Sequence, residues 1–151
     1  MNKQKRLNNF MADLGGFLER YYSSAIDQMT KEEKEDWIIL RIEGPHDSVI
    51  EMWTEGAEVT IIFSESHWHI DDYNDPCDYS TIYENTIDGV MEVLQEKTGT
   101  YSCWSGGEAI GDASFGDCTS EQIIESAQGN FKAFDEIRIK RWANELEIIK
   151  V

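Results

Sequence analysis

The spacing of apolar residues changes once along this chain, and that change constrains the fold more than any other feature. From about Lys5 to Met29 the apolar residues recur every three or four positions, which predicts a helix with one apolar stripe. From Trp37 onward they alternate with polar residues, which is the period of a strand with one buried face. We therefore expect an N-terminal helix followed by an antiparallel sheet.

Four strands are predicted between Trp37 and Tyr73. Turn-forming residues at 44–47, 55–56 and 64–66 separate these strands. Strands joined by such short turns pair as an antiparallel meander. The last strand carries two of the three histidines, His67 and His69.

The second half of the sequence mixes helix and strand signals. A central helix is expected from Tyr79 or Ser80 to Gly99, a hairpin over 100–104 and 108–115, and a short helix over 119–127 capped by Thr119 or Ser120. Alternation over 137–141 and 145–151 predicts a C-terminal hairpin. The predicted fold is α+β: a single domain over residues 1–151, with a mostly antiparallel sheet (meander plus C-terminal hairpin) and the N-terminal and central helices packed on one side.

Charge is distributed unevenly along the chain. The net charge is -17, from 30 acidic and 13 basic residues. Between Ile42 and Phe131 lie 19 of the acidic residues and one basic residue, Lys97; we call this stretch the acid block. Its field repels nucleic acid and anionic membrane and attracts a basic partner or cations. The alternative is a charge that serves solubility alone.

The cysteines and the N-terminus indicate a compartment. Cys77, Cys103 and Cys118 are odd in number and lack the spacing of a zinc site, which predicts reduced thiols. Cys103, beside Trp104 on a strand, is expected in the core. The basic N-terminus leads into an amphipathic pattern instead of an apolar signal segment, and no apolar run has the length of a membrane span. We expect a cytoplasmic protein.

The spacing His67-x-His69-x-Asp71 resembles the metal-binding stretch of metallo-β-lactamase-type hydrolases, in which a strand end delivers two imidazoles and a carboxylate to zinc. Those hydrolases have further histidines downstream, whereas His46 precedes the motif here. A one-sided sheet gives the same pattern without a metal, because alternate residues face solvent while Trp68 and Ile70 face the core. We favour this second interpretation and predict no metal and no cofactor.

Other catalytic motifs are absent from the sequence. The stretch Ser105-Gly106-Gly107 lacks the lysine and the helix start of a phosphate-binding loop. A basic cluster at Arg138, Lys140, Arg141 and Trp142 is expected to pair with the acid block instead of binding nucleic acid. We therefore predict that the chain is not an enzyme.

Several of these features together resemble a bacterial polymorphic-toxin immunity protein. They are the chain length, the acid block, the strand Val59–Phe63 leading to His67–Asp71, the helix that follows, and the hairpin Trp104–Glu108. The resemblance covers roughly Glu58 to Phe115. It implies a small cytoplasmic protein that binds the C-terminal domain of a toxin and blocks its active site.

A toxin that cuts nucleic acid presents a basic groove, which carboxylates can fill in place of phosphates. The residues predicted to contact such a basic toxin are Glu65, His67, His69, Asp71, Asp72, Tyr73, Asp75 and Asp78. Two alternatives stay open, a non-catalytic interaction or scaffold domain and a metal-dependent hydrolase that uses His67, His69 and Asp71. The sequence is compatible with either a monomer or a homodimer.

Overall fold

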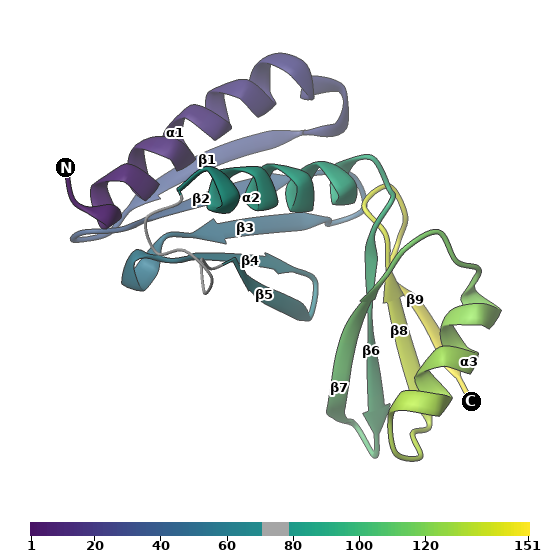
Figure 1. Cartoon of the computed structure of the whole chain (residues 1–151). Helices are drawn as coiled ribbons and strands as arrows, with labels where there is room; N and C mark the ends of the chain where they lie inside the picture. Colours follow the sequence, from purple (N-terminus) through teal and green to yellow (C-terminus); the bar gives the residue numbers. More distant parts are fainter. Residues whose placement is uncertain (71–78) are drawn as a thin grey trace.

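Two antiparallel sheets form the frame of the structure, and helices cover one face of each (Figure 1). The computed structural model describes residues 1–70 and 79–151. The strand order is β1-β2-β3-β4-β5 in the first sheet and β7-β6-β8-β9 in the second. No helix in the described part of the chain is both long enough and apolar enough to cross a membrane. The α+β class is confirmed, and the strands prove to be divided between two sheets.

The first sheet is a meander in which each strand pairs with the next one along the chain. Its strands are β1 (Gln28–Glu33), β2 (Ile38–Glu43), β3 (Val49–Trp53), β4 (Val59–Phe63) and β5 (Ser66–Ile70). The helices α1 (Lys3–Tyr21) and α2 (Tyr79–Leu94) lie on one face, where Phe10 of α1 stacks on Tyr83 of α2 with ring centroids 4.2 Å apart. Apolar residues of the helices and the sheet form one core between these layers.

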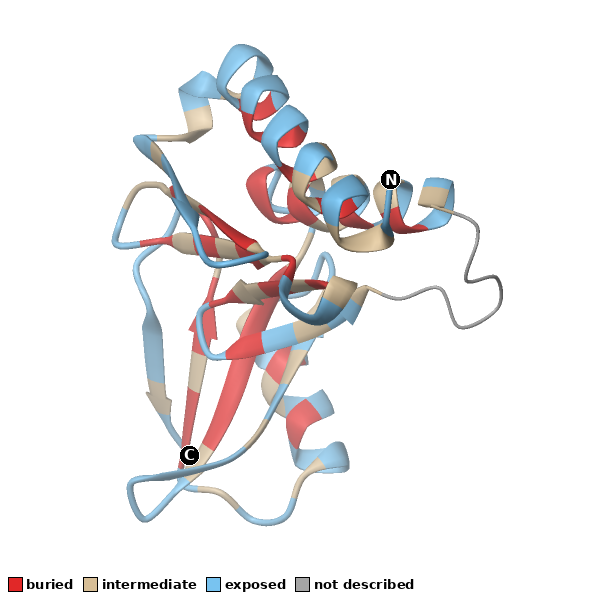
Figure 2. Ribbon diagram, turned by 90° about the vertical axis from the view of Figure 1, so that its left-hand side faces the viewer, coloured by how far each residue is buried: buried red, intermediate tan, exposed pale blue. Residues whose placement is uncertain are grey.

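The second sheet has its own smaller core. Its strands are β6 (Gly99–Ser105), β7 (Glu108–Phe115), β8 (Glu136–Lys140) and β9 (Glu147–Lys150), and α3 (Ser120–Asn130) covers one face. Ile123 and Ala127 of α3 pack on buried residues of β6 and β8, which Figure 2 shows in red. Cys103 is fully buried in this core, as predicted, and burial raises the pKa of its thiol.

Most predicted elements are confirmed. The four-strand meander, the central helix, the 100–115 hairpin, the 119–127 helix and the C-terminal hairpin all occur. Thr119 caps α3, because its hydroxyl accepts from the Gln122 amide at 3.2 Å while the Gln122 side chain accepts from the Thr119 amide at 2.9 Å. Gly99 begins β6 instead of ending the central helix, which ends at Leu94.

The N-terminal helix is shorter than predicted. It ends at Tyr21, and a turn of 3₁₀ helix, η1 (Ser23–Ala25), leads into β1. Met29 extends the helical spacing of the apolar residues, but it pairs with Ile42 across the sheet and reaches the same core from a strand. Because β1 is an edge strand that is exposed along most of its length, no apolar alternation marks it in the sequence.

Trp142 joins the two sheets. It follows β8 of the second sheet, yet its indole is only 1% exposed within the core of the first. The ring centroid lies 6.2 Å from that of Phe63, and the indole N–H donates to the Ala25 carbonyl at 2.8 Å. Gly44 gives the ring its space, since a Cβ there would lie 2.2 Å from the indole.

Replacing Trp142 by alanine should lower the free energy of unfolding by about 3–5 kcal/mol, because it leaves a cavity and removes the hydrogen bond to the partly buried Ala25 carbonyl. Trp37→Ala is the matched control. Because Trp37 is only half-buried, its replacement should lower the free energy of unfolding by less than Trp142→Ala does. Urea unfolding followed by circular dichroism measures both variants, and Trp142→Phe provides a milder change if the alanine variant does not fold. Equal losses for Trp142→Ala and Trp37→Ala would contradict the joining role of Trp142.

Candidate functional site

Only three of the residues predicted to contact a partner can be placed. Glu65, His67 and His69 belong to β5 or to the turn before it. Asp71, Asp72, Tyr73, Asp75 and Asp78 lie outside the described residues. β5 is an edge strand of the first sheet, so one side of its backbone is free of strand neighbours.

The alternation predicted for β5 is confirmed. His67 and His69 are exposed on the face away from the helices, whereas Trp68 and Ile70 pack against the core. The two imidazole centroids are 5.4 Å apart. Nδ1 of His69 lies 3.0 Å from a Glu58 carboxylate oxygen and 3.0 Å from the Thr60 hydroxyl. Among the described residues, Nε2 of His69 makes no hydrogen bond or ion pair.

The structure does not complete a metal site at these histidines. Among residues 1–70 and 79–151, no three His, Cys, Asp or Glu side chains are grouped so that they could hold a metal ion. The third predicted ligand, Asp71, lies outside those ranges. The hydrolase hypothesis therefore stays a prediction from sequence.

Glu65 is engaged within the chain. Its carboxylate accepts a short hydrogen bond from the Ser102 hydroxyl and lies 3.5 Å from the Arg138 guanidinium. Arg138 also stacks on Trp104, 3.7 Å from the ring centroid, and pairs with Glu136 at 2.6 Å. The prediction that the basic cluster pairs with the acid block is thus confirmed for Arg138. These contacts fix the turn before β5 onto the second sheet.

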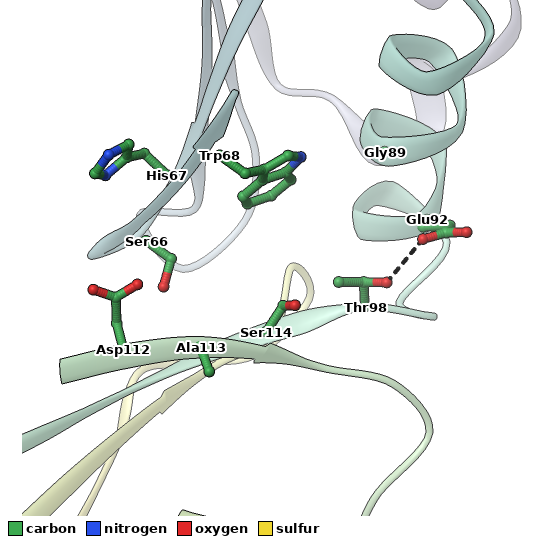
Figure 3. Close-up of a pocket in the computed structure, with 9 residues that line it drawn as sticks. All are labelled: Ser66, His67, Trp68, Gly89, Glu92, Thr98, Asp112, Ala113 and Ser114. Carbon is green, nitrogen blue, oxygen red and sulfur yellow. Dashed lines mark hydrogen bonds between the residues drawn. The ribbon is translucent and has the colours of Figure 1, made fainter. Parts of the chain in front are cut away.

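A crevice of about 360 Å³ opens between β5, α2 and β7 (Figure 3). We call it the β5/α2/β7 crevice. Ser66, His67 and Trp68 line it from β5, Gly89 and Glu92 from α2, and residues 112–114 from β7. Asp112 and Glu92 lie at opposite ends, and the Trp68 indole forms the roof between them. No lysine or arginine lines the crevice, so its charge is negative.

Ser66 has a buried hydroxyl without a partner. The residue is 4% exposed, and its Oγ is the one buried side-chain oxygen or nitrogen in the described part of the chain that makes no hydrogen bond. Figure 3 shows this hydroxyl pointing from β5 towards β7, into the crevice. Leaving such a group unpaired costs about 1–3 kcal/mol, so a hydrogen-bonding ligand there would relieve a real penalty.

Three carboxylates follow the exposed side of α2. Glu84, Asp88 and Glu92 are spaced four residues apart and all are exposed; we call them the α2 carboxylate row. Like charges at this spacing destabilise a helix by about 0.2–0.5 kcal/mol per pair. Negative charge is also unfavourable near a helix C-terminus, where α2 has no basic residue in its last turn. Apart from the hydrogen bond that Glu92 accepts from the Thr98 hydroxyl, the row therefore makes no described contact that stabilises α2.

Six basic side chains, in contrast, form ion pairs with carboxylates of the described residues. The pairs are Arg41 with Glu43 and Glu51, Arg138 with Glu65 and Glu136, Arg141 with Glu147, Lys150 with Glu136, Lys31 with Glu33 and Lys34 with Glu32. Within the described residues, no ion pair neutralises the α2 carboxylate row. The excess of negative charge is therefore displayed on the surface at α2.

Ser48 and Lys140 form a buried pair that resembles a serine nucleophile with a lysine base. Lys140 Nζ donates to Ser48 Oγ at 2.6 Å, to the Arg141 carbonyl at 3.0 Å and to the Asn144 carbonyl. Burial lowers the pKa of Lys140, but three acceptors match the three N–H donors of an ammonium. The Ser48 hydroxyl donates to the Trp142 carbonyl at 2.5 Å, so its proton points away from the lysine. This geometry clamps the chain after β8 and does not activate Ser48.

Sequence reasoning missed most of this site. The row at Glu84, Asp88 and Glu92 could have been found, because a spacing of four on a predicted helix places side chains on one side. Ser66 and Asp112 carry no such signal, because they come together only where one sheet meets the other.

Comparisons with known proteins identify no relative of this chain. No protein-family model matches the sequence, and neither a curated protein nor a solved structure is detectably similar to it.

The ion pairs that Glu136 of β8 makes within the second sheet should weaken in acid. Hydrogen bonds from Lys150 and then Arg138 lower the pKa of Glu136. A carboxyl whose folded-state pKa is lowered stabilises the fold above its unfolded pKa of about 4.3, and that contribution is lost as pH falls through the folded-state pKa. The difference in unfolding free energy between the natural chain and Glu136→Gln should therefore be largest at neutral pH and shrink below about pH 4.

Urea unfolding of both chains across this pH range measures the difference. Glu125→Gln is the control, since Glu125 is exposed on α3 outside its first turn, and its difference from the natural chain should stay small throughout. A Glu136→Gln difference that is independent of pH would show that these ion pairs do not stabilise the second sheet.

Proposed function

We propose that this chain is an immunity protein: a non-catalytic cytoplasmic inhibitor that binds a basic toxin domain and blocks its active site. The observation that carries the proposal is the exposed α2 carboxylate row, which has no ion-pairing partner among the described residues, whereas six basic side chains elsewhere are paired with carboxylates. An arrangement that costs helix stability and displays charge outward is expected at a binding surface.

Electrostatics supports a basic partner. Unpaired carboxylates on one surface raise the association rate with a positively charged protein, and the gain falls as salt screens the charges. A toxin that cuts nucleic acid has a positively charged groove, which a row of carboxylates can enter in place of phosphates. The α2 carboxylate row and the β5/α2/β7 crevice beside it offer such a surface.

A stable complex also needs buried contact area of about 800 Å² on each partner, with aromatic anchors near the centre. Trp68 is partly buried at the roof of the crevice and provides such an aromatic group. His67 lies at the margin of the same crevice, and His69 is exposed further along β5 on the face away from the helices. The contacts predicted at Asp71, Asp72, Tyr73, Asp75 and Asp78 lie outside the described residues and stay predictions from the sequence.

Co-purification from the cell of origin tests the proposal first. The captured partner should be a basic domain whose expression alone stops growth, and co-expression of this chain should restore growth. A partner that is harmless when expressed alone would favour the non-catalytic scaffold instead.

Charge reversal then tests the surface. Glu84→Lys with Asp88→Lys should slow association with the captured partner by about tenfold or more at low salt, and the difference should narrow as salt is added. Glu121→Lys with Glu125→Lys is the matched control, because it changes the net charge equally on exposed residues of α3. Stopped-flow or surface-plasmon measurements give both rates. Equal slowing by the α2 and α3 pairs would show that net charge alone acts and would remove the assignment to α2.

A further inference from the structure

We infer that the β5/α2/β7 crevice is the receptor for one arginine side chain of the partner. Its guanidinium would stack beneath the Trp68 indole and donate to the Asp112 carboxylate and to Ser66 Oγ. This inference rests on the proposed function, because it assigns the anchor of the same surface.

The Ser66 hydroxyl is the first support. It is more than nine-tenths buried, makes no hydrogen bond within the described residues and points into the crevice (Figure 3). No described residue supplies its partner, so the hydroxyl is available to a group that enters the crevice. An N–H donor that enters the crevice would form a hydrogen bond with Oγ. When that donor leaves, the hydroxyl is unpaired again.

Charge identifies the kind of donor. Asp112 points from β7 towards β5, at the end of the crevice where Ser66 lies, and Glu92 adds a second carboxylate at the other end (Figure 3). Glu92 accepts a hydrogen bond from Thr98 at 3.1 Å, whereas none is found for Asp112 among the described residues. A cation is therefore attracted to the Asp112 end, and an anion is repelled from the whole crevice.

Shape distinguishes arginine from lysine. A guanidinium is planar, stacks on aromatic rings and presents N–H groups in a fork that matches a carboxylate, whereas an ammonium is a compact and strongly hydrated charge. The crevice offers an indole, a carboxylate and a hydroxyl around one space, which suits the planar group. His67 lies at its margin with the imidazole directed away from α2.

Gly89 keeps the crevice open on the α2 side. A Cβ at this position would lie 3.5 Å from the Trp68 indole nitrogen and 3.3 Å from Ile61. A longer side chain would extend into the space beside the indole. The absence of a side chain at Gly89 thus leaves room next to the ring for a long, narrow group.

A small probe tests the crevice without the partner. N-acetyl-arginine methylamide is titrated into the full chain while the indole N–H resonances are followed by NMR, with the Trp68 signal assigned by its loss in Trp68→Phe. The signal should shift saturably in the millimolar range. The citrulline analogue has the same shape without the charge and should cause no saturable shift.

Matched variants locate the probe. Asp112→Asn and Ser66→Ala should each weaken probe binding by about tenfold. Glu108→Gln is the control for Asp112, because it removes an exposed carboxylate from the same strand outside the crevice. Ser66→Ala should leave the urea midpoint unchanged or raise it, since it removes an unpaired buried hydroxyl. If the Ser66 hydroxyl only supports the fold, or only holds a water molecule, Ser66→Ala will have no effect on probe binding, and that result would contradict the inference.

The outcomes separate this inference from the proposed function. An unmoved Trp68 resonance, equal shifts with citrulline, or full affinity in Asp112→Asn would overturn the arginine receptor. If Glu84→Lys with Asp88→Lys slows association with the captured partner while Ser66→Ala and Asp112→Asn do not weaken that complex, the inhibitor proposal stands and the crevice assignment falls. If the probe binds as predicted and the partner is not a toxin, the crevice stands and the inhibitor proposal falls.

Discussion

Trp142 places the second sheet against the first, because its indole follows β8 and is buried in the core beneath α1 and α2. Burial of an aromatic side chain is among the largest single contributions available to a chain of this size. Lys140 is the last residue of β8, two residues before Trp142. Its ammonium anchors the following loop by donating to Ser48 and to two backbone carbonyls. The placement of the second sheet against the first therefore depends on Lys140 and Trp142, which lie at and just after the end of β8.

The candidate site is a consequence of this junction. The β5/α2/β7 crevice exists because β7 of the second sheet is held below β5 and α2 of the first. The contacts of Glu65 with Ser102 and Arg138 fix the turn before β5, so Ser66 keeps its direction. A site built between two packed layers is held more firmly than one on a single loop. Its charge comes from α2 and β7 together.

The sequence predicts those features that depend on local periodicity. Alternation on β5 correctly separated the exposed histidines from Trp68 and Ile70, and helical spacing located α2. The sequence does not predict β1, because this edge strand is exposed along most of its length and its residues do not alternate between apolar and polar. The meeting of Ser66 with Asp112 was not predictable, because it depends on how two sheets are joined and not on the order of neighbouring residues.

The central claim is that a basic partner docks on the surface made by the α2 carboxylate row and the β5/α2/β7 crevice. Hydrogen–deuterium exchange of the chain, with and without the captured partner, tests it most directly. Slower exchange is predicted in β5, α2 and β7, with α3 and β9 unchanged. Protection confined to α3 and β9, with none in β5, α2 or β7, would contradict the claim.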